Sequence, residues 1–375
     1  MKKFKISFLA LSTLALLSTS TGCSGGASGS DDDATPVAES TSPAGNPAST
    51  PTVAVSVPVA ISNGEQATPV AEAPVSESNS AESVAGSVSE NESTDLGTSL
   101  PAGFLEIPGA TFDGSTTVCS PGVAFNPGNY SRVFIARRTI TIPSLWVCDH
   151  EVTQGEYYSI MKIHPSKFSS NPASGEAQAN RPVESVSWYD ALVYCNTRSI
   201  KEGYTPCYKI GGKTNPFEWG TVPTRSNDTW NSATCDFTAN GYRLPTEAEW
   251  EYLARGGNLS NSGQKKYSGE NKSVESVAWY SNNSGSKTHE VKKKNANESE
   301  LYDMSGNVSE WCWDWYDFID ADTPSTGAKS GTERISRGGS WKCDSTICAV
   351  DDRAYDTPDC RYGYNGFRVV RSRSE

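Results

Sequence analysis

The aromatic and basic residues of this 375-residue chain are almost absent from its first quarter. No aromatic residue lies between Phe8 and Phe104, and no lysine or arginine lies between Lys5 and Arg132. Residues 24–100 are instead rich in Ser, Thr, Ala, Pro, Val, Glu and Gly. Such a stretch cannot bury enough apolar surface to offset the entropy that ordering costs. We therefore predict a disordered tether over residues 23–100 and one folded domain over residues 101–375.

The first residues predict export. Three lysines near the amino terminus precede an apolar run, residues 6–17, that is too short to span a bilayer. Small residues then lead to Cys23, a pattern that resembles a bacterial lipoprotein cleavage site, although Ser20 stands where such sites usually carry leucine. We expect a signal peptide over residues 1–22 and a lipid on Cys23 that anchors the protein to a membrane, at the cell surface or the periplasmic face. The alternative is an ordinary secretory signal.

The net charge bears on the class of partner, and the cysteine content bears on disulfide bonds. The net charge of −12 and the absence of a basic patch argue against a nucleic-acid partner. Export permits disulfides, and we expect Cys207 to pair with Cys235. Of the ten cysteines, lipidation of one leaves nine, so at least one has no partner within the chain.

The folded part shows short strand and helix signals separated by long polar stretches. Residues 104–109 and 144–152 are typical of strands. Helices are expected to begin after Thr153, Ser187 and Thr246, with Trp250, Leu253 and Ala254 forming an inward stripe on the third. Few regular elements and no change in texture predict a single irregular α+β domain.

The last unit, residues 337–371, has the pattern of a presented site. We expect strands at 338–341 and 366–370, with about two dozen polar residues between them. Two thiols, Cys343 and Cys348, lie inside this segment.

Six blocks in order resemble the formylglycine-generating enzyme family, also called the sulfatase-modifying factor domain. They occupy residues 148–154, 181–188, 240–252, 301–311, 337–341 and 366–368. The resemblance implies a C-type-lectin-like fold with little regular structure. Enzymes of this family oxidise a cysteine in a Cys-x-Pro-x-Arg segment of sulfatases to formylglycine, with molecular oxygen and copper held by two cysteines. Cys343 and Cys348 fall on those cysteines and Ser340 on the active-site serine, which implies a copper-dependent oxidase with a sulfatase substrate.

The same segment also resembles the variable region of surface lipoproteins diversified by retroelements, as in treponemes. That resemblance has fixed points at Trp341, Cys348, Arg353, Pro358, Arg361 and 366–368. This resemblance favours ligand binding over catalysis, and the expected ligand is a protein. The candidate ligand-binding residues are Cys343, Asp344, Ser345, Asp351, Asp352, Tyr355, Asp356, Thr357, Asp359, Tyr362, Tyr364 and Asn365. Cysteine parity favours the same interpretation, because a free Cys343 leaves eight cysteines for four disulfides.

One turn resembles a calcium site of the family. Its expected ligands are the carboxylates of Asp303 and Glu310 and the carbonyls of Gly306 and Val308, hard oxygen donors that suit a structural calcium ion. The alternative is a polar turn before a tryptophan cluster. The three histidines lack metal-ligand spacing. We expect His150 to be structural and His164 and His289 to lie at the surface.

Overall fold

The computed structural model describes residues 100–122 and 132–373. The expected signal peptide, Cys23 and the expected tether up to residue 99 lie outside the described residues. Within the described part, no helix is long and apolar enough to cross a membrane. The fold mixes helices and strands with little regular secondary structure, as predicted.

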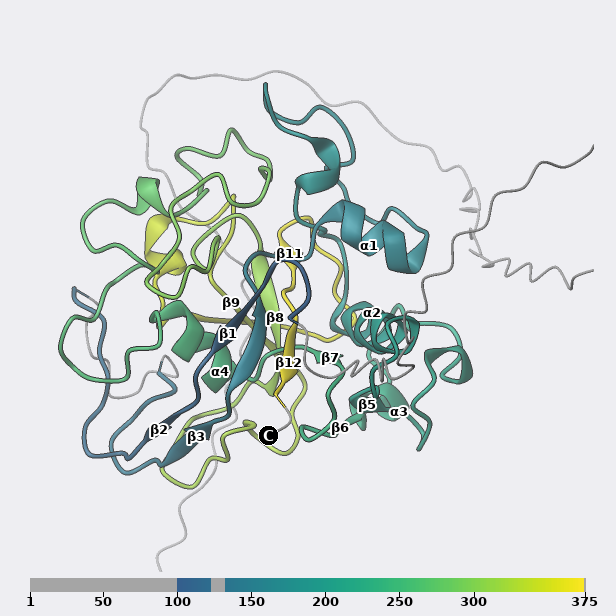
Figure 1. Cartoon of the computed structure of the whole chain (residues 1–375), viewed down its shortest axis with the longest axis horizontal. Coiled ribbons are helices and arrows are strands. Elements are labelled where there is room, and N and C mark those ends of the chain that lie inside the picture. Colours follow the sequence, from purple (N-terminus) through teal and green to yellow (C-terminus); the bar gives the residue numbers. More distant parts are fainter. Residues whose placement is uncertain (1–99, 123–131, 374–375) are drawn as a thin grey trace, which may run out of the picture. The chain divides into compact units, whose positions relative to one another are not determined.

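Two four-stranded sheets organise the domain (Figure 1). The first is antiparallel and brings the two ends of the domain together, since the C-terminal strand lies between a strand from the start of the domain and one from its middle. Its order is β1 (Phe104–Ile107), β4 (Leu145–Cys148), β12 (Val370–Ser372), β7 (Tyr242–Arg243). The second has the order β10 (Arg353–Asp356), β9 (Arg334–Arg337), β8 (Ser309–Trp315), β11 (Asn365–Gly366).

Smaller elements complete the described part. Two strand pairs are β2 (Ala110–Phe112) with β3 (Ile140–Ile142), and β5 (Tyr208–Lys209) with β6 (Thr234–Cys235). Four short 3-10 helices are η1 (Gln178–Asn180), η2 (Pro216–Glu218), η3 (Val274–Ser276) and η4 (Ser345–Cys348).

The three predicted helices are confirmed, and each begins with a capping box. They are α1 (Gln154–Met161), α2 (Trp188–Lys201) and α4 (Glu247–Ala254), capped by Thr153, Ser187 and Thr246. In each, the capping hydroxyl accepts from the third backbone N–H, and an acidic side chain at that third position returns the bond. A fourth, α3 (Asp228–Asn231), is a single turn that the sequence did not predict.

Helix α4 is buried more completely than the expected inward stripe of three residues implies. All eight residues of the helix are buried, including Glu247, Glu249 and Glu251. These three carboxylates pair with buried or partly buried arginines, Arg353, Arg243 and Arg337 respectively. A helix can therefore be buried on every face when its charges are matched across the interior.

The strands of the C-terminal unit differ from the prediction. The opening strand is β9, which ends at Arg337, because Gly338 and Gly339 take positive φ values of 91° and 68° that a strand does not allow. The expected closing strand is divided into β11 and β12, and the residues between them, 367–369, are buried but not in a strand. The polar stretch also contains β10, which pairs with β9.

The predicted disulfide is not formed. Cys207 and Cys235 both carry free thiols and are not bonded to each other. Burial raises the pKa of Cys207 to about 11 and raises that of Cys235 as well. Because Cys207 and Cys235 are unpaired, counting the cysteines into pairs no longer favours ligand binding over catalysis.

Candidate functional site

The C-terminal segment, residues 341–365, follows β9 and is attached to the rest of the domain at several points. The indole Nε1 of Trp341 donates to the Gly363 carbonyl (2.7 Å), which joins the two ends of the segment. Arg353 binds both carboxylate oxygens of Glu247 (2.6 and 2.8 Å), and Arg361 binds Asp190 (2.7 Å). Cys348 and Pro358 are buried. Arg353 and Arg361, two of the residues expected to be fixed, thus attach the segment to the rest of the domain.

Most residues between these fixed points are accessible to solvent. Tyr355 and Tyr362 are 45% and 40% exposed, and Asp344 is also exposed. Six further candidates are partly buried: Ser345, Asp352, Asp356, Thr357, Asp359 and Tyr364. The tyrosine rings are supported by stacking, Tyr362 on Tyr364 (4.9 Å between centroids) and Tyr355 on Tyr316 (3.9 Å). The segment therefore presents aromatic rings in defined orientations.

Three of the candidate ligand-binding residues are buried and cannot contact a partner in this conformation. Asp351 accepts from Arg132 Nε at 3.4 Å, which accounts for a charged side chain in the interior. The Asn365 amide donates to Asp356 (2.9 Å). Cys343 is also buried, with its Sγ 3.2 Å from the Ser340 Oγ.

The two thiols and the serine predicted for catalysis lie in one buried corner. Cys348 is in η4, and its Sγ donates to the Asp344 carbonyl (3.8 Å). A Cβ at Gly339 would lie only 3.0 Å from that sulfur, so the glycine lets the chain pass closely over it. Burial and the neighbouring Cys343 raise the pKa of the Cys348 thiol well above its usual value.

Residues 98–373 match the family described as the sulfatase-modifying factor enzyme 1-like domain. The chain belongs to this family. Two relatives match this chain over nearly their whole length. Chaperone protein LppX of Paenibacillus barcinonensis is 36% identical over 296 residues, which is 73% of this chain and 97% of that protein. The solved structure of Treponema denticola variable protein 1 is 38% identical with a TM-score of 0.61, covering 72% of this chain and 95% of that one.

Formylglycine-generating enzymes match over a shorter region. The enzyme of Streptomyces coelicolor is 35% identical over 161 residues, which is 38% of this chain and 50% of the enzyme. The family assignment predicted from the six blocks is confirmed, as is the similarity to a treponemal variable protein.

The two carboxylates expected to hold the family's calcium ion differ in their surroundings. Both carboxylate oxygens of Glu310 are occupied by the Arg368 guanidinium (2.6 Å each), and one also accepts from the indole of Trp250 (2.7 Å). The Oδ1 of Asp303, in contrast, is buried without a hydrogen-bond partner, so this oxygen is available to a cation. Calcium at this turn stays a prediction.

Three buried carboxylates face one another beside this turn. Burial and the neighbouring Asp303 and Glu310 raise the pKa of Glu151 well above its usual value. Burial raises the pKa of Asp303 to about 6. Arg368 is the guanidinium that offsets this charge most directly, through its ion pair with Glu310.

The histidines only partly follow the sequence prediction. His164 is exposed, as expected, and stacks on Tyr158. The prediction for His289 was wrong, because this side chain is buried between Glu176 (2.8 Å) and the Ser284 carbonyl (2.7 Å). His150 lies next to Cys148 and Glu156, a grouping that sequence reasoning missed. A Cys-x-His pair followed by a glutamate in the first turn of a helix was the signal that could have found it.

Proposed function

We propose that this protein is an exported, lipid-anchored protein with a C-type-lectin-like domain whose C-terminal segment binds a protein ligand. The anchor is the lipid on Cys23, and the residues after it tether the domain to the membrane. The ligand-contacting residues are those of the segment that reach solvent, with Tyr355 and Tyr362 at their centre.

One observation carries this proposal. Along residues 341–365, the positions expected to be fixed are buried or bonded to the domain, whereas the positions between them are mostly accessible. Residues that face solvent can change without unfolding the domain, so one scaffold can present many surfaces. Stacked tyrosines suit this task, because a rigid aromatic ring supplies contact area at low entropic cost.

The relatives support a binding role. Two of the proteins matched over nearly their full length are a variable protein and a protein named as a chaperone. The match to formylglycine-generating enzymes covers about half of their length.

Site-specific crosslinking tests the proposal. Full-length protein carrying Tyr362→p-benzoylphenylalanine, displayed on its host cells and irradiated, should form a covalent adduct with a protein. The matched control is Phe217→p-benzoylphenylalanine, because Phe217 is 75% exposed and lies outside the segment. Equal labelling from both positions, or none from position 362, would contradict the proposal. Natural variants should also differ at exposed positions of the segment more than at Arg353 or Arg361.

The contact between Ser340 and Cys343 favours a second candidate, a copper-dependent formylglycine-generating oxidase. Two thiols in one loop are soft donors of the kind that bind copper(I). The test is to incubate the reduced protein with copper(I), oxygen and a Cys-x-Pro-x-Arg peptide and to look for formylglycine by mass spectrometry. Formation of the aldehyde, and its loss in Cys343→Ser, would establish the enzyme. An unchanged peptide would exclude it.

A further inference from the structure

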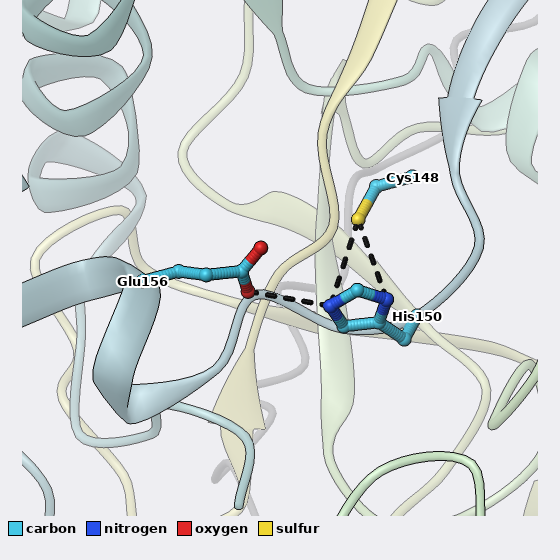
Figure 2. A group of neighbouring side chains, drawn as sticks. All are labelled: Cys148, His150 and Glu156. Atoms are coloured by element: carbon cyan, nitrogen blue, oxygen red, sulfur yellow. Dashed lines mark hydrogen bonds and ion pairs between the residues drawn. The ribbon is translucent and has the colours of Figure 1, made fainter. Parts of the chain in front are cut away.

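Three side chains of different chemistry meet where β4 ends and α1 begins (Figure 2). Cys148 is the last residue of β4, His150 follows two residues later, and Glu156 lies in the first turn of α1. The Cys148 sulfur is 3.8 Å from Nδ1 and 4.0 Å from Nε2 of His150. The His150 Nε2 is 3.3 Å from the Glu156 Oε2. One sulfur, one nitrogen and one oxygen thus all lie within 4.8 Å of one another.

Neighbouring groups hold these ligand atoms in place. The Nδ1 of His150 is bonded to the Asp149 carboxylate, which leaves Nε2 directed at Glu156. Asp149 is itself paired with the Lys292 ammonium (2.6 Å). A carboxylate on the far nitrogen is the usual way in which a protein orients a metal-binding imidazole.

The Glu156 carboxylate is held independently. Its Oε2 accepts from the backbone N–H (2.8 Å) and the hydroxyl (2.9 Å) of Thr153, the bonds of the capping box. The cap therefore fixes the position of this carboxylate before any ion arrives, which lowers the cost of assembling a site.

The cluster opens to solvent on one side. His150 and Glu156, together with Asn180 and Lys292, line a surface hollow of about 410 Å³. Cys148 closes the other side, where it is buried. An ion could therefore enter from the hollow and keep one exchangeable coordination position there.

We propose that Cys148, His150 and Glu156 bind a divalent transition metal of the Zn²⁺ type. The ligands are the Cys148 Sγ as thiolate, the His150 Nε2 and the Glu156 carboxylate, with the fourth tetrahedral position facing the hollow. Mixed sulfur, nitrogen and oxygen donors suit Zn²⁺ or Co²⁺ and do not suit calcium, which prefers oxygen alone. Binding requires the Cys148 Sγ as thiolate and the His150 Nε2 without its proton, so the protons on these two atoms are released, and the thiolate and carboxylate then balance the charge of the ion.

The test uses cobalt as a spectroscopic probe. Full-length protein, reduced and freed of metal with EDTA, is titrated with Co²⁺. We expect one equivalent to bind, with a thiolate-to-cobalt charge-transfer band in the near ultraviolet that Zn²⁺ abolishes. Cys148→Ser should lose the band, whereas Cys343→Ser, Cys348→Ser and Cys119→Ser should keep it. Asp149→Asn, which removes only the orienting carboxylate, should weaken Co²⁺ binding by roughly 10- to 100-fold.

A second measurement guards against misfolded variants. Zn²⁺ should raise the Tm of the parent protein but not that of His150→Ala, whose circular dichroism should match the parent. The proposal fails if the parent shows no charge-transfer band at millimolar Co²⁺. It also fails if the band survives Cys148→Ser but not Cys343→Ser, because the metal would then sit in the C-terminal segment.

Discussion

Replacing Arg368 by methionine should destabilise the domain more than almost any other single change to its charges. The side chain is fully buried and donates to both oxygens of Glu310, to the Cys148 carbonyl (3.3 Å) and to the Tyr302 carbonyl (2.9 Å). Methionine keeps much of the volume but none of the charge or the donors. Glu310 would then remain buried, with only the Trp250 indole still donating to it.

The magnitude follows from the charge left behind. Removing one partner of a buried ion pair typically costs about 3–5 kcal/mol, because the other charge stays desolvated without compensation. The upper half of that range is expected here, since Glu151 and Asp303 are further buried carboxyls close to Glu310. A domain is stable by only about 5–15 kcal/mol, so the variant should lose roughly a quarter or more of its stability.

Urea unfolding at pH 7, followed by tryptophan fluorescence, measures the effect. The matched control is Arg373→Met, which breaks the half-exposed pair with Glu106 and should cost no more than about 1 kcal/mol. Each protein is measured with EDTA and with excess Ca²⁺. A loss below about 1 kcal/mol for Arg368→Met in EDTA would refute the reasoning. A large loss in EDTA that Ca²⁺ restores would show that Ca²⁺ binds at the turn once Glu310 is released from Arg368.

Three further predictions follow from local contacts. Burial and the neighbouring Glu247 raise the pKa of Asp314 to about 7. The folded protein therefore keeps the proton on the Asp314 carboxyl to higher pH than the unfolded chain does. As a result, the folded protein loses stability as pH rises from about 4 to 7. The free energy of unfolding of Asp314→Asn should therefore rise relative to that of the parent across that window, by at most about 4 kcal/mol. Urea titrations at a series of pH values measure the difference, and a difference that does not change with pH would contradict the prediction. Thr246→Ala removes the cap of α4 and should cost about 1 kcal/mol in the same assay, and no loss would mean that the capping box contributes nothing. Cys23→Ser should abolish incorporation of labelled fatty acid and release the protein from membranes, and retention of label would place the lipid elsewhere.

Local sequence signals predicted the features that depend on neighbours in the chain. The caps at Thr153, Ser187 and Thr246 were predicted because a capping box is complete within four residues. The family could be recognised because six separate blocks occur in order. The strand expected over residues 104–109 is confirmed by β1, because its signal lies in contiguous residues.

Features that depend on distant partners were missed or only half predicted. Asp351 has the same composition signal as Asp344, yet one is buried against Arg132 and the other is exposed. Their difference comes from an arginine more than two hundred positions away. His289 looked like a surface residue because Glu176, its partner, is also remote in the sequence.

The sequence by itself determined how the three main helices begin and which family the chain belongs to, since both are written in short contiguous patterns. The tertiary structure alone decided which side chains of the C-terminal segment face solvent, that Glu310 is neutralised by Arg368, and that Cys148 and His150 meet Glu156. Burial and charge pairing are set by contacts between residues far apart along the chain, and no local pattern records them.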